Sequence, residues 1–152
     1  MYTKGTLLDC KTTALNMLTR RDHSQVELGY KLKTKGFSEH EIAQACEYCL
    51  GLGYLDDERY TRAQVRHHAN KGRGVLRIKQ ELKLKGVSET LVTRALEECD
   101  IDWFELAATC AGKKGANTDL KDIKQKSRLV RHLQQRGFDF EQINYALDTL
   151  QQ

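Results

Sequence analysis

Apolar positions recur along the chain in three segments that share one pattern around a glycine. Each segment has a Lys-Gly or Arg-Gly pair, then an apolar residue and a Ser or Asp, at Gly36, Gly86 and Gly137. Leucine or isoleucine stands four and eight positions before each glycine, and the glycines lie 50 and 51 residues apart. Because residues four apart lie on one face of a helix, the pattern predicts an amphipathic helix before each glycine.

The residues around each glycine also predict where one helix ends and the next begins. The glycine suits the left-handed position that follows a helix, and the Ser or Asp two residues later suits an N-cap. An aliphatic residue four positions past each cap completes a hydrophobic staple with the residue before the cap. Ser38 with Glu41, and Asp139 with Gln142, have the spacing of a capping box. Each glycine is therefore predicted to join two helices.

A further helix is predicted before each of these pairs. Asp9 is expected to be the N-cap of the first of these helices. At the second, Leu55 is expected to form a hydrophobic staple and Asp56 the N-cap. At the third, Asp102 is expected to be the N-cap and Glu105 to complete a capping box. The nine predicted helices cover 9–22, 24–35, 39–50, 57–70, 75–85, 89–99, 103–112, 122–136 and 140–151.

The fold class follows from these elements. No run alternates with a period of two, so the prediction is all-α, a tandem array of three three-helix repeats. The repeats are predicted at 1–52, 53–100 and 101–152. The absence of proline from 152 residues agrees with an all-helical protein. The hydrophobic share of 39% is too high for a disordered chain, and charge interrupts it too often for a membrane span.

The cysteines indicate a reducing compartment. They are odd in number, which argues against a disulfide framework. The five are Cys10, Cys46, Cys49, Cys99 and Cys110. Cys46-x-x-Cys49 lacks the second pair of a zinc site, so we expect core residues and no metal. The stretch Met1–Leu8 lacks the apolar segment of a secretory signal, so we expect a cytoplasmic protein.

Charge alternates in blocks that follow the repeat. Residues 59–86 carry nine Lys/Arg and one Asp/Glu, residues 87–111 carry one and six, and residues 112–137 carry eight and two. Such basic blocks can neutralise phosphates or bind an acidic protein surface. The cations assigned to a binding face are Arg59, Arg62, Arg66, Lys71, Arg73, Arg77, Lys79, Lys83, Lys124, Arg128 and Arg131.

Several smaller motifs leave alternatives open. Residues 71–74 form a basic, glycine-rich turn before a helix, where free N–H groups could bind phosphate or carboxylate. The Gly-Leu-Gly sequence at residues 51–53 is typical either of a hairpin whose backbone N–H groups bind phosphate or of a simple loop that ends a helix. Leu76 and Leu84 either pack on the next repeat or belong to a binding face. No nucleophile, base and acid stand together, so we expect neither an enzyme nor a cofactor.

Together these motifs resemble the RecX family. Leu55-Asp56-Asp57-Glu58-Arg59-Tyr60 resembles its LDD-x-x-[FY] segment, residues 71–86 resemble its central motif, and residues 136–143 fit its C-terminal repeat. Many relatives carry proline at the position of Val75. The residues that we take as the structural signature are Leu55, Asp56, Asp57, Tyr60, Gly74, Ile78, Leu82, Gly36, Gly86 and Gly137. The resemblance extends from about Ala14 to Leu150.

The resemblance implies a regulator of the RecA recombinase in DNA repair and the SOS response. It implies an elongated, curved array that binds in the groove of the RecA–single-stranded DNA filament as a monomer. There it would inhibit ATP hydrolysis, strand exchange and filament growth, and it could bind DNA directly. The alternative is a stand-alone DNA-binding protein built of helix-turn-helix-like modules. The acidic third helix of each repeat argues against that alternative, because a recognition helix enters the major groove between phosphates.

Overall fold

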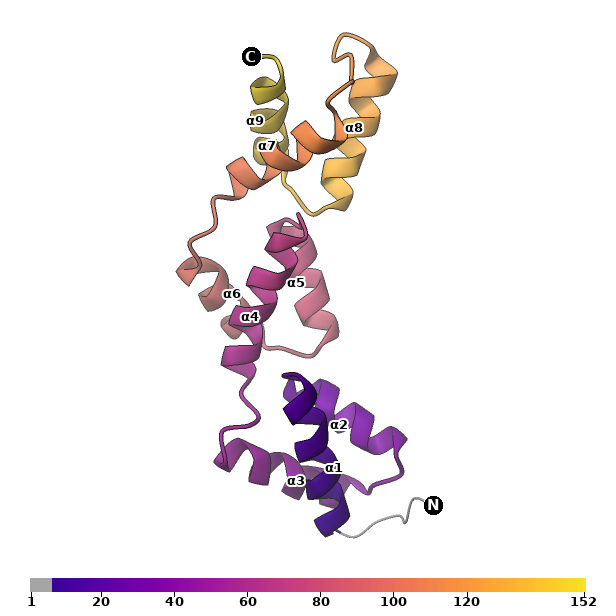
Figure 1. Cartoon of the computed structure of the whole chain (residues 1–152), viewed down its shortest axis with the longest axis vertical. Helices are drawn as coiled ribbons and strands as arrows, with labels where there is room; N and C mark the ends of the chain where they lie inside the picture. The colour runs from indigo at the N-terminus through magenta and orange to yellow at the C-terminus, as the bar shows by residue number, and fades with distance from the viewer. Residues whose placement is uncertain (1–6) are drawn as a thin grey trace. The chain divides into compact units, whose positions relative to one another are not determined.

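The computed structural model describes residues 7–152, and this part of the chain holds nine α-helices and no strand (Figure 1). The helices are α1 (Leu7–Arg20), α2 (Gln25–Thr34), α3 (Glu39–Gly51), α4 (Asp57–Asn70), α5 (Val75–Leu84), α6 (Glu89–Glu98), α7 (Trp103–Lys114), α8 (Ile123–Gln135) and α9 (Phe140–Leu150). The predicted all-α fold is confirmed, with every helix end within two residues of its predicted place. Most of the stretch from which we argued against a secretory signal lies outside the described residues.

The described helices belong to two compact units. Unit 1 holds the chain up to residue 63 together with residues 82–95, and unit 2 holds residues 64–81 and 96–152. Each unit therefore combines one complete set of three helices with parts of α4, α5 and α6. The repeat limits expected from the sequence divide the chain differently and stay a prediction. No helix between residues 7 and 152 has both the length and the apolar content that crossing a bilayer requires.

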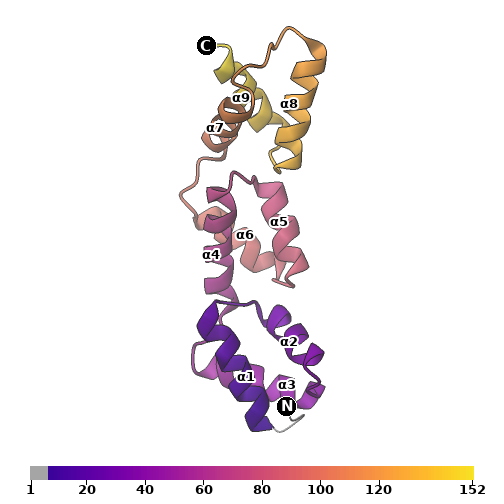
Figure 2. The ribbon, with the colours of Figure 1, turned by 45° about the vertical axis from the view of Figure 1, so that its right-hand side comes forward.

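Unit 1 has its core between α1, α2 and α3. The helix α1 packs on α3, and the two lie together in both views of the ribbon (Figures 1 and 2). Leu28 and Leu32 from α2 meet Cys10 and Ala14 from α1 in this core. Cys46 and Cys49 are buried in the same cluster, which confirms that they are core residues.

Unit 2 has its core between α7, α8 and α9. The helices α7 and α9 lie side by side in both views (Figures 1 and 2). Ala107 and Ala111 are the fully buried residues of α7, and their small side chains let Ile143 and Ala146 of α9 approach closely. Leu133 of α8 is also fully buried in this cluster.

The three repeated glycines end their helices as predicted. Gly36, Gly86 and Gly137 have φ of 95°, 73° and 99°, in the left-handed region. At Gly137, the N–H groups of Gly137 and Phe138 donate to the carbonyls of Gln134 and Leu133, the two bonds of a Schellman motif. The capping boxes at Ser38 and Asp139 are both present. Local sequence therefore determines these helix ends.

One predicted cap and one predicted capping box are wrong, whereas the predicted cap at Asp102 is confirmed. Asp9 lies in the first turn of α1 and not at its N-cap, because the helix already includes Leu7. Asp102 caps α7 by accepting from the N–H groups of Phe104 and Glu105. Glu105, however, accepts a hydrogen bond from the Tyr145 hydroxyl of α9, so its carboxylate serves α7–α9 packing in place of a capping box.

Leu84 does not pack on the next repeat, since 80% of its surface is exposed. It stands two positions past the buried Leu82, which places it on the opposite side of α5. Leu76 is half-exposed. Of the two alternatives that the sequence left open for Leu84, only the exposed one agrees with the structure.

Candidate functional site

In unit 2, the C-terminal turn of α8 is bound to the N-terminus of α5. The N–H of Gly74 donates to the carbonyl of Arg136 at 2.7 Å, and the N–H of Leu76 donates to the carbonyl of Gly137 at 3.0 Å. A Cβ on Gly137 would lie 2.5 Å from the Cβ of Arg77, so only glycine allows this approach. The positive end of the α5 dipole thus meets the negative end of the α8 dipole.

This junction overturns the expected binding of an anion by the backbone N–H groups of residues 71–74. The N–H groups of Gly72 and Arg73 bind carbonyls of α4, and those of Gly74 and Leu76 bind carbonyls of the turn after α8. Protein carbonyls therefore occupy the amides that were expected to bind an anion. Residues 51–53 form a helix-terminating loop, in which the N–H of Gly53 donates to the carbonyl of Leu50.

Unit 1 contains a junction of the same plan. The hydroxyl of Ser24, the N-cap of α2, donates to the carbonyl of Lys85 at 2.6 Å. The N–H of Gln25 donates to Oδ1 of Asp57 at 2.7 Å. Gly86 lies against the side chain of Val26, as Gly137 lies against α5 in unit 2. Gly86 and Gly137 therefore each end one helix and dock on another.

A buried carboxylate lies at the unit 1 junction. Only 7% of the Glu27 side chain is exposed, and its Oε2 lies 2.6 Å from Nη2 of Arg21 and 3.3 Å from Nζ of Lys85. Burial alone would raise the pKa of Glu27, but the hydrogen bond from Arg21 and the charges of Arg21 and Lys85 outweigh it and lower the pKa to about 2. Sequence reasoning missed Glu27, because a single Glu in an amphipathic helix carries no signal of burial.

Arg59 and Arg62, both assigned to the binding face, make internal contacts. The Arg59 guanidinium donates from Nε to Oδ2 of Asp22 at 3.1 Å, from Nη2 to Oδ1 of Asp22 at 3.0 Å, and also to the carbonyls of Gly53 and Tyr54. Arg62 pairs with Glu58, four residues earlier, at 2.8 Å. Arg59 therefore binds the segment before α4 to the one before α2, and few of its donors face a partner.

The signature residues hold the fold together. Leu55, Tyr60, Ile78 and Leu82 are each at most 2% exposed. Asp56 caps α4 by accepting from the N–H of Arg59 at 3.1 Å. The LDD-x-x-[FY] segment thus supplies a staple, a cap and a core aromatic residue.

The remaining assigned cations divide into two groups. Arg73 binds the imidazole Nδ1 of His68 at 2.7 Å, and Arg77 lies 3.7 Å from Oε1 of Glu81 and donates to the carbonyl of Gln135. The other seven are exposed, and within residues 7–152 none forms an ion pair with a carboxylate. These seven, which we call the exposed cations, are Arg66, Lys71, Lys79, Lys83, Lys124, Arg128 and Arg131.

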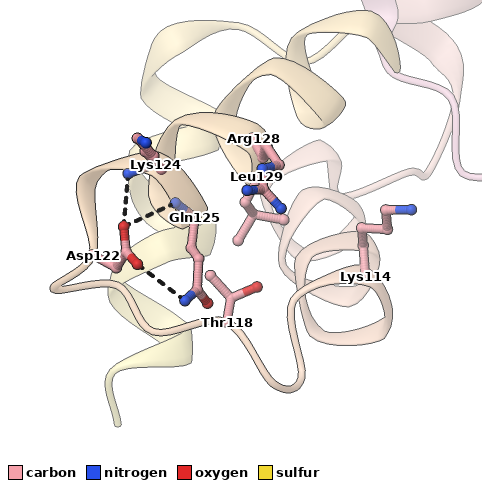
Figure 3. Close-up of a pocket in the computed structure, with 7 residues that line it drawn as sticks. All are labelled: Lys114, Thr118, Asp122, Lys124, Gln125, Arg128 and Leu129. Atoms are coloured by element: carbon pink, nitrogen blue, oxygen red, sulfur yellow. Dashed lines mark hydrogen bonds between the residues drawn. The ribbon is translucent and has the colours of Figure 1, made fainter.

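Two of the exposed cations line a hollow of about 360 Å³ in unit 2 (Figure 3). Lys124 and Arg128 come from α8, and Lys114 from the end of α7 also lines the hollow, although its side chain extends away from the other two in Figure 3. Asp122, the N-cap of α8, also lines it and accepts from the N–H of Lys124 at 2.9 Å. We call this the Asp122 hollow.

A second hollow of about 380 Å³ lies beside the end of α7 and holds no carboxylate. Its wall includes the cysteine thiol of Cys110, whose Sγ lies 3.5 Å from the carbonyl oxygen of Gly72. Its basic and titratable members are Lys71, Lys113, Lys114, His132 and Arg136. We call this the cationic hollow. Sequence reasoning included Lys113, Lys114 and Arg136 in a basic side but assigned only Lys71 of this set to the binding face. The packing of α7 on α8 brings these residues together.

Unit 1 carries a different kind of concavity, an open groove between α2, α3 and the start of α6. Val26, Tyr30 and Leu50 form its exposed apolar lining. Its charged members are Lys33, Glu39, Glu47 and Asp57. The only sequence signal was the four-residue spacing of Val26 and Tyr30 off the core face of α2. Because its exposed lining is apolar and three of its four charged residues are acidic, the groove differs in chemistry from the two hollows of unit 2.

The described residues offer no metal centre. No group of three or more His, Cys, Asp or Glu side chains between residues 7 and 152 lies close enough to hold an ion.

Comparisons with known proteins match this architecture. Family models match residues 10–49 as "RecX, first three-helix domain", 56–96 as "RecX, second three-helix domain" and 100–147 as "RecX, third three-helix domain". The prediction of three three-helix repeats is thereby confirmed. A crystal structure of RecX from Lactobacillus salivarius aligns with a TM-score of 0.80 over 95% of this chain and 96% of that one. At 21% sequence identity this likeness shows a common fold.

Curated relatives show the family directly. The regulatory protein RecX of Vibrio vulnificus is 50% identical over 141 residues, which cover 93% of this chain and 92% of the relative. That of Vibrio cholerae is 47% identical over 143 residues, 94% of each chain. That of Actinobacillus pleuropneumoniae is 38% identical over 140 residues, 90% of this chain and 91% of the relative. With three matching domains and these full-length relatives, the chain belongs to the RecX family of regulatory proteins.

Proposed function

We propose that this protein regulates RecA by binding the RecA–single-stranded DNA filament as a monomer. Bound there, it inhibits ATP hydrolysis, strand exchange and filament growth in DNA repair and the SOS response, and it catalyses no reaction itself. Membership of the RecX family supports this function, because the curated relatives are named as regulatory proteins. The proposal assigns the binding to the exposed cations.

The exposed cations are the observation that carries the proposal. Lys79 and Lys83 on α5, and Lys124 and Arg128 on α8, are exposed and lack a carboxylate partner among the described residues. Like charges left without partners repel one another and weaken the compact state, so a bound polyanion would relieve that cost. A filament of protein on DNA supplies such a partner in its phosphates, with release of counterions as an additional gain.

The junctions explain how several cationic segments can act together. The turns after α5 and α8 are bound by hydrogen bonds to the helices of the preceding repeat. A repeating filament offers the same phosphate and protein surface many times, so contacts at more than one segment raise avidity without a single strong contact. Because the N–H groups at the start of α5 are occupied internally, the contacts must come from side chains.

The stand-alone DNA-binding alternative receives less support. A helix that reads the major groove must approach phosphates on both sides. The helix α3 carries Glu39, Glu41 and Glu47 with no Lys or Arg, and α9 carries Glu141 and Asp148 with none. Third helices of this charge would be repelled from the groove that a recognition helix enters.

One experiment separates the two functions. The protein is titrated into preformed RecA filaments on single-stranded DNA, and the DNA-dependent ATPase is followed at several salt concentrations. In parallel, its affinity for the same DNA without RecA is measured. The proposal predicts inhibition of the ATPase at protein concentrations well below those that saturate naked DNA. Inhibition that appears only where naked DNA is already saturated would favour the stand-alone alternative.

A further inference from the structure

We propose that the cationic hollow of unit 2 binds a phosphate group of a single-stranded DNA backbone. This assignment rests on the proposed function, since the filament is where the protein would meet that DNA. It adds Lys113, Lys114 and Arg136 of the basic side to the assigned binding residues and gives them one defined place in unit 2.

The walls of the hollow come from three segments that hold one another in place. Lys71 belongs to the turn after α4, Lys113 and Lys114 to the last turn of α7, and Arg136 to the end of α8. Nη1 of Arg136 donates to the carbonyl of Lys71 at 2.8 Å, which fixes the guanidinium at the wall. One N–H of the five is used in that bond, so the planar fork keeps donors for an anion.

The charge of the hollow is uncompensated. Its lining includes four Lys or Arg side chains and no carboxylate, and within residues 7–152 none of the four forms an ion pair. The pKa of His132 is lowered, first by burial and then by the charges of Arg136 and Lys114. An anion bound beside these groups would stabilise the protonated imidazole and so raise the pKa of His132.

The hollow also continues into a longer track. Lys114 lines both the cationic hollow and the Asp122 hollow. Four of the basic residues on α8 and at its C-cap recur every four residues, which places neighbours about 6 Å apart along one side of the helix. They are Lys124, Arg128, His132 and Arg136. A chain of linked phosphates matches such a row better than a single phosphate ion, so we assign a nucleic-acid backbone.

The imidazole of His132 reports directly on occupancy. Its pKa is measured by NMR in the full-length protein, alone and with a thymidine oligonucleotide, and in a third sample with inorganic phosphate at the same phosphate concentration. The proposal predicts that the oligonucleotide raises the pKa of His132 and that inorganic phosphate raises it less. An unchanged pKa in both samples would overturn the site. An equal or larger rise with inorganic phosphate would overturn the assignment to DNA.

A matched pair of variants tests the lysines. K113Q/K114Q removes two charges from the last turn of α7, and K33Q/K35Q removes two from the end of α2 in unit 1. Because each phosphate contact on a single strand contributes about 0.7 to the slope of log K against log salt, K113Q/K114Q should lower the slope by about 1.4. The control should keep the wild-type slope. Equal slopes for the two variants would contradict the proposal.

These measurements use no RecA, so the two proposals can fail separately. If the protein inhibits the RecA ATPase but the oligonucleotide leaves the pKa of His132 unchanged, the phosphate site in the cationic hollow is wrong and the regulatory function still stands. A protein whose His132 responds, but which leaves the ATPase unaffected, would overturn the regulatory function and keep the phosphate site.

Discussion

Lys85 contacts Glu27 across the junction of unit 1, with its Nζ 3.3 Å from Oε2 of the buried carboxylate. The same Lys85 accepts the hydroxyl hydrogen bond of Ser24 on its carbonyl. Backbone and side chain of one residue thus fasten the end of α5 to the start of α2. The free energy of this junction should depend on the charge of Glu27.

Replacing Glu27 with Gln should therefore destabilise the protein in a pH-dependent way. The pKa of Glu27 is about 2 in the folded protein and near the ordinary 4.3 in the unfolded chain. The charge contributes fully above the unfolded value and is lost as the pH falls towards 2. We expect E27Q to lower the free energy of unfolding by about 2–3 kcal/mol at pH 7, from a shift worth about 1.4 kcal/mol per pKa unit.

Urea unfolding at several pH values measures this effect. The gap between wild type and E27Q should narrow as the pH falls from about 4.5 to about 2, since Glu27 then becomes protonated. E47Q changes an exposed Glu of α3 and serves as the control with little effect at any pH. A gap that stays constant between pH 7 and the acid limit would show that the pKa of Glu27 is not lowered.

Alanine substitutions at two glycines separate the contribution of helix docking to stability from the contribution of backbone conformation. Gly137 and Gly53 have φ of 99° and 79°, so alanine strains the backbone at both, by about 1–2 kcal/mol. A Cβ on Gly137 meets Arg77 at 2.5 Å, whereas a Cβ on Gly53 meets nothing within 4 Å. We expect G137A to cost a further 1–3 kcal/mol or so, the usual range for overpacking. Thermal unfolding that shows equal losses for the two variants would refute the docking role.

Arg59 should behave as a structural residue. Its fork makes two bonds to Asp22 that a lysine cannot reproduce, so R59K should destabilise the protein by about 1–2 kcal/mol although the charge is kept. D22N should cost a similar amount, and the double variant should cost clearly less than the sum. Chemical denaturation of the four proteins tests this cycle. If R59K unfolds like wild type, the pair carries no structural role.

Thiol labelling should separate the cysteines into two classes. Cys10, Cys46 and Cys49 are buried, and burial, assisted by the nearby Glu41, raises the pKa of Cys10 to about 11. Cys99 and Cys110 are partly exposed. A thiol reagent at pH 8 should modify two cysteines in the native protein and five after denaturation, as counted by mass spectrometry. Modification of all five in the native protein would contradict the packing of unit 1.

The helices were predictable because their signals are local. Capping residues, staples and four-residue apolar spacing act within one turn of chain, so Gly36 or Ser38 could be interpreted without a structure. The contacts of Arg59 with Asp22, and of Gly74 with Arg136, join positions 37 and 62 residues apart. No spacing rule encodes such pairs, so a basic turn resembled an anion site and a structural arginine resembled a phosphate ligand.

The exposed cations were all assigned from the sequence, but the cationic hollow could be assigned only in part for the same reason. Charge counting located Lys79, Lys83, Lys124 and Arg128, whose exposure follows from lying off the apolar face of a helix. It included Lys114 and Arg136 in a basic side but did not assign them to the binding face, because they gain their role from the packing of α7 on α8 and from a hydrogen bond to Lys71.

The central claim is that the exposed cations bind the RecA filament, and charge reversal tests it most directly. K79E/K83E and K124E/R128E each reverse two exposed cations, and K33E/K35E makes the same change in unit 1. All three should unfold like wild type, since none of these lysines or Arg128 forms an ion pair in the described structure.

Inhibition of the RecA single-stranded-DNA-dependent ATPase is then compared between the three variants and the wild type. We predict that each of the first two variants needs about tenfold more protein for half-inhibition, because the new carboxylates would face the negative charge of the filament and like-charge repulsion costs up to several kcal/mol. The control should reach half-inhibition at the wild-type concentration. Half-inhibition at the wild-type concentration by both folded variants would contradict the account.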